Sequence, residues 1–301
     1  MNGNCSTTGC KSPERLPDAA ALEQQWKSID WKKAETEVNR LQTRIAKATQ
    51  EKKWNTVKRL QYLLTHSYDA KVLAVRKVTT NKGKKTPGVD GELWSTPAAK
   101  MRGVLTLTDK GYKAKPLRRV FIEKKGKKAK RPLGIPCMYD RAMQTLYALA
   151  LDPVSETTAD TKSFGFRKGR CAQDACEYIF TALSRRNSPQ WVLEGDIKGC
   201  FDHISHDWLI EHIPMDKSVL KQFLKAGFIF ERELFPTDEG TPQGGVISPI
   251  LANMALDGMQ KVLSDRFHTN RLGKVDLRFK NAHKVNLVRY ADDFIVTAAT
   301  K

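Results

Sequence analysis

Two amphipathic helices are predicted near the start of the chain. In each of them apolar residues recur at helical spacing, which places them on one face. One stripe comprises Trp31, Val38, Leu41 and Ile45, and the other comprises Trp54, Val57, Leu60 and Leu64. The opposite faces are basic and carry Lys32, Lys33, Arg40, Arg44, Lys47, Lys52, Lys53, Lys58 and Arg59. A solvated face and a nucleic-acid-binding face explain this charge equally well.

The next pattern is a basic β-hairpin. Residues 110–131 contain eleven basic residues and one acid, interrupted by the apolar run 120–122. We expect a strand ending near Ile122, a Lys-rich tip around Gly126 and a return strand over residues 130–135. A hairpin this charged cannot bury both faces, so it should bind something anionic.

The remaining patterns predict helices, one buried strand and a second hairpin. Helical periodicity covers residues 138–151, 171–186 and 246–267. The apolar run 191–193 indicates a buried strand that ends at Asp196. Two β-rich runs, 285–290 and 294–296, are separated by Ala291, Asp292 and Asp293, which indicates a hairpin with two acids at its turn.

Composition narrows the class of partner. Lys and Arg total 52 against 33 acidic residues, giving a net charge of +19 and a pI near 9.7. This imbalance favours a polyanion, with nucleic acid ahead of an anionic membrane surface. No apolar stretch approaches the roughly 20 residues that span a bilayer, and no signal peptide is evident. We therefore expect an intracellular protein.

Three carboxylates are candidates for a metal site. Asp292 and Asp293 follow one apolar strand and Asp196 ends another. Two divalent ions in a phosphoryl-transfer site need oxygen ligands from more than one element, and the carbonyl of Ile197 could complete one coordination sphere. An Asp pair at a turn is also ordinary turn chemistry, so these residues alone leave the question open.

Several further motifs carry a resemblance to a known family. Tyr290-Ala291-Asp292-Asp293 is similar to the catalytic box of group II intron reverse transcriptases/maturases. Other blocks of that family resemble residues 131–136, 163–167, 196–204 and 240–249, in the family's order. The resemblance runs from about Thr86 to the end of the chain.

The resemblance implies an α+β right-hand polymerase fold. The expected divisions are a disordered leader (1–15), an N-terminal helical extension (16–80), fingers (81–140 and 204–245) and an incomplete palm (141–203 and 246–301). The palm should be an antiparallel sheet flanked by helices. Because the chain stops eight residues after Asp293, we expect a fragment without a thumb and with weak or no polymerase activity of its own.

The resemblance also assigns roles to residues. Asp196, Asp292 and Asp293, with the carbonyl of Ile197, are expected to bind two Mg²⁺ ions and catalyse nucleotidyl transfer. The residues expected to bind the incoming dNTP are Lys124, Arg131, Phe201 and Gln243, and Phe201 would act as a steric gate against a ribose 2′-hydroxyl. The residues expected to contact RNA are Lys84, Lys85, Arg167, Lys168, Arg170 and Gly244. A core phenylalanine, turn glycines and solvated lysines are the structural alternatives.

The expected function is therefore an RNA-directed DNA polymerase that also binds intron RNA for splicing and retrohoming. Its partners would be intron and template RNA, a DNA primer and dNTPs, in the bacterial cytoplasm and associated with ribonucleoprotein or the nucleoid. Two alternatives stay open: an RNA-binding splicing cofactor without polymerase activity, and a retron or diversity-generating reverse transcriptase. The oligomeric state, with a homodimer among the candidates, is also open.

Overall fold

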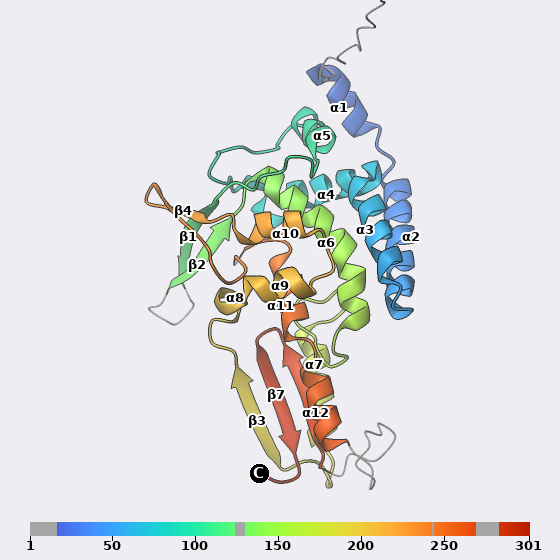
Figure 1. The fold of residues 1–301 in the computed structure, drawn as a ribbon, viewed down its shortest axis with the longest axis vertical. Helices are drawn as coiled ribbons and strands as arrows, with labels where there is room; N and C mark the ends of the chain where they lie inside the picture. Colours follow the sequence, from blue (N-terminus) through green and yellow to red (C-terminus); the bar gives the residue numbers. More distant parts are fainter. Residues whose placement is uncertain (1–16, 124–129, 243, 269–282) are drawn as a thin grey trace, which may run out of the picture.

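The computed structural model describes residues 17–123, 130–242, 244–268 and 283–301. The predicted leader and the tip of the basic hairpin lie outside this part of the chain. Helices and two separate sheets form an α+β fold (Figure 1), as expected. A helical body occupies the middle of the molecule, the sheet of the basic hairpin lies at one side of it, and the sheet carrying the acids projects from one end.

The N-terminal region is entirely helical. It contains α1 (Ala19–Lys27), α2 (Trp31–Gln50), α3 (Trp54–His66), α4 (Tyr68–Thr80), the short 3₁₀ helix η1 (Lys82–Lys85) and α5 (Pro97–Thr106). The two predicted amphipathic helices are confirmed as α2 and α3. Side-chain caps fix several starts: Asp30 accepts from the N–H of Lys33 at 3.0 Å, and Ser67 accepts from that of Ala70 at 3.1 Å.

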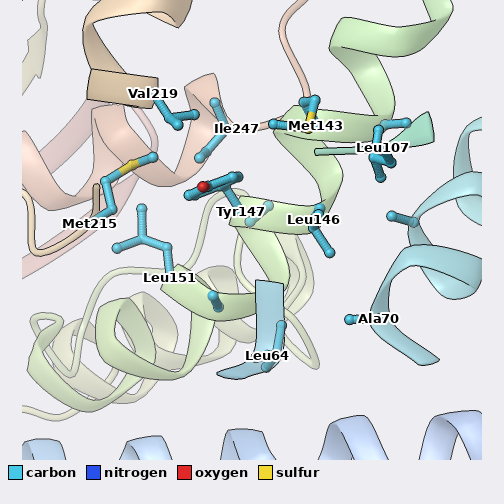
Figure 2. Packing of buried hydrophobic residues seen from close by; sticks show 14 of the residues in the cluster. Leu64, Ala70, Leu107, Met143, Leu146, Tyr147, Leu151, Met215, Val219 and Ile247 are labelled. Carbon is cyan, nitrogen blue, oxygen red and sulfur yellow. The ribbon is translucent and has the colours of Figure 1, made fainter. Parts of the chain in front are cut away.

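Helix α6 (Met138–Thr158) is the centre of the main core. Helices α2, α3, α4 and α11 (Ser248–Leu256) all pack against it. Figure 2 shows Leu146 and Leu151 of this helix among Leu64, Met215 and Ile247, which come from distant parts of the sequence. The predicted helix ended at residue 151, but α6 continues for seven more residues with Pro153 inside it. Val154, the residue after the proline, is buried in the main core.

The sheet of the basic hairpin has the strand order β2-β1-β4-β5. The predicted hairpin is confirmed as β1 (Leu117–Glu123) paired antiparallel with β2 (Lys130–Ile135). Strand β4 (Phe228–Phe230) runs parallel to β1 and forms its own hairpin with β5 (Glu233–Phe235). Helices α8 (Cys200–His203), α9 (His206–His212) and α10 (Lys217–Leu224) connect this region to the second sheet.

The second sheet has three antiparallel strands in the order β3-β7-β6. Strand β3 (Trp191–Asp196) pairs with β7 (Asp293–Ala298), which pairs with β6 (Asn286–Tyr290). Helices α7 (Ala172–Leu183) and α12 (Met259–Phe267) contact β6. The second hairpin is thus confirmed, but the burial expected for β3 is wrong: Trp191, Val192 and Leu193 are 48%, 49% and 61% exposed.

One helix predicted from the sequence is two separate helices in the structure. The apolar periodicity of residues 246–267 gave a single helix, whereas the structure has α11 and α12 with a break at Asp257 and Gly258. Gly258 has φ +108°, a conformation that only glycine adopts readily. The break lets Asp257 turn toward the interior, where it meets Arg289.

Candidate active site

The sheet pairing brings the three candidate carboxylates together. Asp196 at the end of β3 lies directly opposite Asp293 at the start of β7, and Asp292 precedes β7 in the turn from β6. The backbone N–H of Ile197 donates to the carbonyl of Asp292 at 3.2 Å. Three acids from two distant segments therefore meet at one edge of the sheet.

The turn that carries Asp292 and Asp293 is strained and firmly anchored. Ala291 has φ +58°, a left-handed conformation that costs a non-glycine residue roughly 1–3 kcal/mol. The fully buried Arg289 donates to the Ala291 carbonyl at 3.2 Å, to Asn253 Oδ1 at 3.1 Å and to Asp257 Oδ1 at 2.7 Å. The turn that carries Asp292 and Asp293 is thus tied to the end of α11 through one guanidinium.

The neighbouring acids contribute to a raised pKa of Asp293. The pKa of Asp293 is raised above its usual value by partial desolvation and then by the charges of Asp292, Asp196 and Glu194. In the residues that the structure describes, no three acidic, His or Cys side chains are gathered closely enough to hold a metal ion. Hard carboxylate oxygens are nevertheless the donors that Mg²⁺ prefers. A cation would reduce the repulsion, so the chemistry of this donor set fits divalent ions.

A pocket of about 690 Å³ opens over these acids. Its wall includes Asp196, Ile197, Asp292 and Asp293 together with residues from β2 and from the loop before α11. The sequence-predicted residues Arg131, Phe201 and Gly244 line the same pocket. The structure therefore brings one predicted triphosphate-binding residue, the predicted gate and the three acids around a single cavity. The Ile197 carbonyl already accepts from the N–H of Cys200 at 3.1 Å, which leaves it one lone pair.

Two of the residues predicted to bind the dNTP, Lys124 and Gln243, lie outside the described residues. Gly244 has φ +107°, and a Cβ there would lie 2.7 Å from the Gly134 carbonyl oxygen. Close packing on β2 thus accounts for this glycine, while its exposed backbone still borders the pocket.

The position of Arg167 does not support the predicted RNA contact. Its side chain is only 5% exposed and pairs with Glu156, at 2.7 Å for the closest contact. The same guanidinium donates to the carbonyls of Asp160 at 2.8 Å and Ser163 at 3.1 Å. Since these partners engage all its nitrogens, Arg167 stabilises the segment before α7 and is not available to a phosphate in this conformation.

The remaining predicted RNA contacts are more accessible. Lys168 is exposed and pairs with Asp152. Arg170 donates to the carbonyls of Thr161 and Ser163, both at 2.8 Å. Lys84 and Lys85 are exposed on η1. Their contact with RNA stays a prediction.

Two residues of the site were missed at the level of sequence. Arg289 anchors the turn that carries Asp292 and Asp293, and the available signal was a lone charge inside an apolar strand. Phe166 lines the pocket, is 55% exposed and has its backbone at φ +59°. Only its position in the 163–167 block pointed to it.

Comparison with known proteins agrees with this geometry. Residues 122–301 match the family model described as reverse transcriptase (RNA-dependent DNA polymerase), and residues 26–107 match the N-terminal domain of reverse transcriptase. The chain belongs to the reverse transcriptase family. Members of this family bind RNA and DNA and generally use divalent metal ions.

Several similar proteins are encoded by introns. The group II intron-encoded protein LtrA of Lactococcus lactis is 36% identical over 228 residues, which cover 72% of this chain and 37% of LtrA. Protein YkfC of Escherichia coli is 32% identical over 252 residues, covering 74% of this chain and 66% of YkfC. A protein in the cob intron of Schizosaccharomyces pombe is 31% identical over 205 residues, covering 65% of this chain and 25% of that protein.

Two facts limit what these comparisons establish. The chain spans well under half the length of LtrA. A solved structure titled "Partial Cas6-RT-Cas1--Cas2 complex" aligns with a TM-score of 0.45 and 22% identity over 80% of this chain and 38% of that one, which is too weak to argue from.

Across residues 17–123, 130–242, 244–268 and 283–301, no helix combines the length and apolar character needed to cross a membrane.

Proposed function

We propose that this chain is the catalytic region of a group II intron protein that synthesises DNA on an RNA template. The observation that carries the proposal is the meeting of Asp196, Asp292 and Asp293 in one pocket with Arg131 and Phe201. The fingers would supply β2 and the loop before α11, and the palm would supply the three-stranded sheet. The domain divisions given above belong to this proposal.

Two Mg²⁺ ions would be held by Asp196 and Asp292, with Asp293 and the carbonyl of Ile197 as further ligands. When bound, such ions activate the primer 3′-hydroxyl and stabilise the leaving pyrophosphate. The raised pKa of Asp293, caused by burial and by neighbouring carboxylates, supports a site whose acids need a counter-charge.

The pocket's own side chains would position the substrates. Arg131 is exposed on β2 and lines the pocket, so its planar guanidinium can hold triphosphate oxygens in a bidentate contact. Phe201 presents a half-buried ring on α8. This ring would lie under the sugar and exclude a 2′-hydroxyl. The template and primer would be an RNA strand and a DNA strand.

Primer extension tests the proposal. The complete reading frame that contains this chain should extend a DNA primer on an RNA template with Mg²⁺, and Asp292→Ala combined with Asp293→Ala should abolish extension. The control is Asp265→Ala, which removes an exposed carboxylate of α12 that pairs with Lys261. Extension by the double variant at the control's rate would contradict the proposal.

A second role, binding of intron RNA during splicing, is favoured by the N-terminal helices. The residues Lys32, Lys33, Arg40, Arg44 and Lys47 are all exposed on α2, and this helix lies within the match to the reverse transcriptase N-terminal domain. Their charge suits the phosphates of a folded RNA. The protein would then act in a ribonucleoprotein in the bacterial cytoplasm or nucleoid.

Filter binding of the 301-residue chain separates this second role from polymerisation. Cognate intron RNA should bind tightly, the affinity should fall steeply with salt, and the aspartate variants should bind as the wild type does. Equal affinity for a scrambled RNA of the same length would contradict specific recognition. A retron-type protein would show no preference for intron RNA.

A further inference from the structure

Phe166 stands in a costly backbone conformation at the wall of the catalytic pocket. Its φ of +59° lies in the left-handed region, which a large aromatic residue rarely adopts. The residue is 55% exposed although the residues on either side are buried. Such strain persists only where the surrounding structure imposes it, and it gathers at functional sites.

The segment around Phe166 is held on the catalytic hairpin at several points. The N–H of Phe164 donates to the Arg289 carbonyl at 2.8 Å, and Asn253 donates to the Gly165 carbonyl at 2.8 Å. Gly165 is pressed so closely against the turn that a Cβ there would lie 2.3 Å from the backbone nitrogen of Ala291. The two hydrogen bonds therefore hold the chain before Phe166 against the turn that carries Asp292 and Asp293.

The chain after Phe166 is held just as firmly. Arg167 is buried on Glu156 and on two carbonyls, as described above. With both neighbours fixed inward, the left-handed backbone turns only Phe166 outward. Its ring meets that of Phe201 edge to face, with centroids 6.0 Å apart and planes at 86°. Edge-to-face pairs are a favourable aromatic geometry.

We propose that Phe166 is a positioning residue that sets sugar discrimination by holding the ring of Phe201 in place. The inference rests on the proposed function, in which Phe201 excludes a ribose. Phe166 acts as the support of that gate: its ring limits the movement by which Phe201 could admit a 2′-hydroxyl. A rigid anchor to the catalytic turn keeps the gate in register with the metal-binding acids.

The measurement is the ratio of kcat/KM for dNTP to kcat/KM for the matching rNTP, in primer extension by the complete protein. Phe166→Ala should lower this ratio roughly 3- to 10-fold, the scale of one lost aromatic pair. Phe166→Asn should do the same while tolerating the left-handed backbone, so a folding defect is separable from loss of the ring. Phe166→Tyr keeps a ring and should restore the ratio to within about twofold of the wild type.

A double-variant cycle decides whether Phe166 acts through Phe201. Once Phe201→Ala has removed the gate, adding Phe166→Ala should leave the ratio unchanged. Equal losses of dNTP and rNTP activity in Phe166→Ala, or additive effects in the double variant, would overturn the inference. If Phe201→Ala itself leaves the ratio unchanged, the proposed gate is wrong and the inference falls with it. If Phe201→Ala relaxes the ratio but neither Phe166→Ala nor Phe166→Asn does, only the inference is wrong.

Discussion

Removing the guanidinium of Arg289 should be among the most damaging single changes in this fold. The side chain is 0% exposed and its partner Asp257 is 11% exposed. Arg289→Met would keep most of the apolar stem but would leave Asp257, Asn253 and the Ala291 carbonyl without this donor. The change would therefore leave the buried carboxylate of Asp257 without its partner and would also loosen the turn that carries Asp292 and Asp293.

The size of the effect follows from the burial. Desolvation raises the pKa of Asp257 and lowers that of Arg289, so burial opposes both charges more strongly than their mutual attraction favours them. Breaking a buried pair by removing one partner costs roughly 3–5 kcal/mol. We expect about 3 kcal/mol at neutral pH, because Asp257 can take up a proton at part of that cost.

Urea unfolding followed by tryptophan fluorescence measures this loss. The matched control is Arg40→Met, which breaks an exposed pair with Glu37 whose side chains are 65% and 37% exposed, and which should cost less than about 1 kcal/mol. Adding Asp257→Leu to Arg289→Met should recover part of the loss, since no charge is then stranded. Equal stability of Arg289→Met and Arg40→Met would refute the reasoning.

Three further outcomes are expected. Burial raises the pKa of Asp140 to about 6, so its protonation favours the folded state below pH 4 and this contribution is lost as the pH rises through 6. The wild type should therefore lose on the order of 3 kcal/mol of unfolding free energy relative to Asp140→Asn between pH 4 and 7, measured by urea titration, and a constant difference would contradict the assignment. Gly165→Ala should cost roughly 1–3 kcal/mol in the same assay because its Cβ would meet backbone, whereas Gly83→Ala, with no contact closer than 3.5 Å, should cost clearly less; equal costs would count against the packing argument. Arg131→Lys should lower kcat/KM for dNTP about tenfold in primer extension through loss of the bidentate contact, and an unchanged value would remove Arg131 from the nucleotide site.

Local sequence patterns were sufficient to predict the two hairpins and the helices whose apolar residues recur with clear periodicity. The basic segment interrupted by the apolar run 120–122 predicted β1 and β2, and the apolar runs around Asp292 predicted β6 and β7. The positions of Asp196, Asp292 and Asp293 at strand ends grouped these acids as candidate metal ligands, and the family motifs then favoured that role over ordinary turn chemistry. Their common pocket adds the geometry that neither pattern nor motif contained.

The features that escaped prediction depend on contacts between distant segments. Helical periodicity continues across Gly258, but the chain breaks there because distant residues hold it: Asp257 pairs with Arg289, and Asp160 accepts from the N–H of Gly258. Arg167 was expected to contact RNA because its local sequence is basic. In the structure its side chain is buried and pairs with Glu156, eleven residues earlier. The outward turn of Phe166 likewise follows from the packing of its neighbours on the catalytic hairpin.

The central claim is that Asp196, Asp292 and Asp293 hold divalent cations, and iron-mediated cleavage of the 301-residue chain tests it most directly. With Fe²⁺ in place of Mg²⁺, and with ascorbate, peroxide and a dNTP present, hydroxyl radicals should cut the backbone near residues 196–197 and 291–293. Excess Mg²⁺ should suppress these cuts, and Asp292→Ala combined with Asp293→Ala should remove them. Cleavage confined to other segments, or the same cuts in the double variant, would contradict the claim.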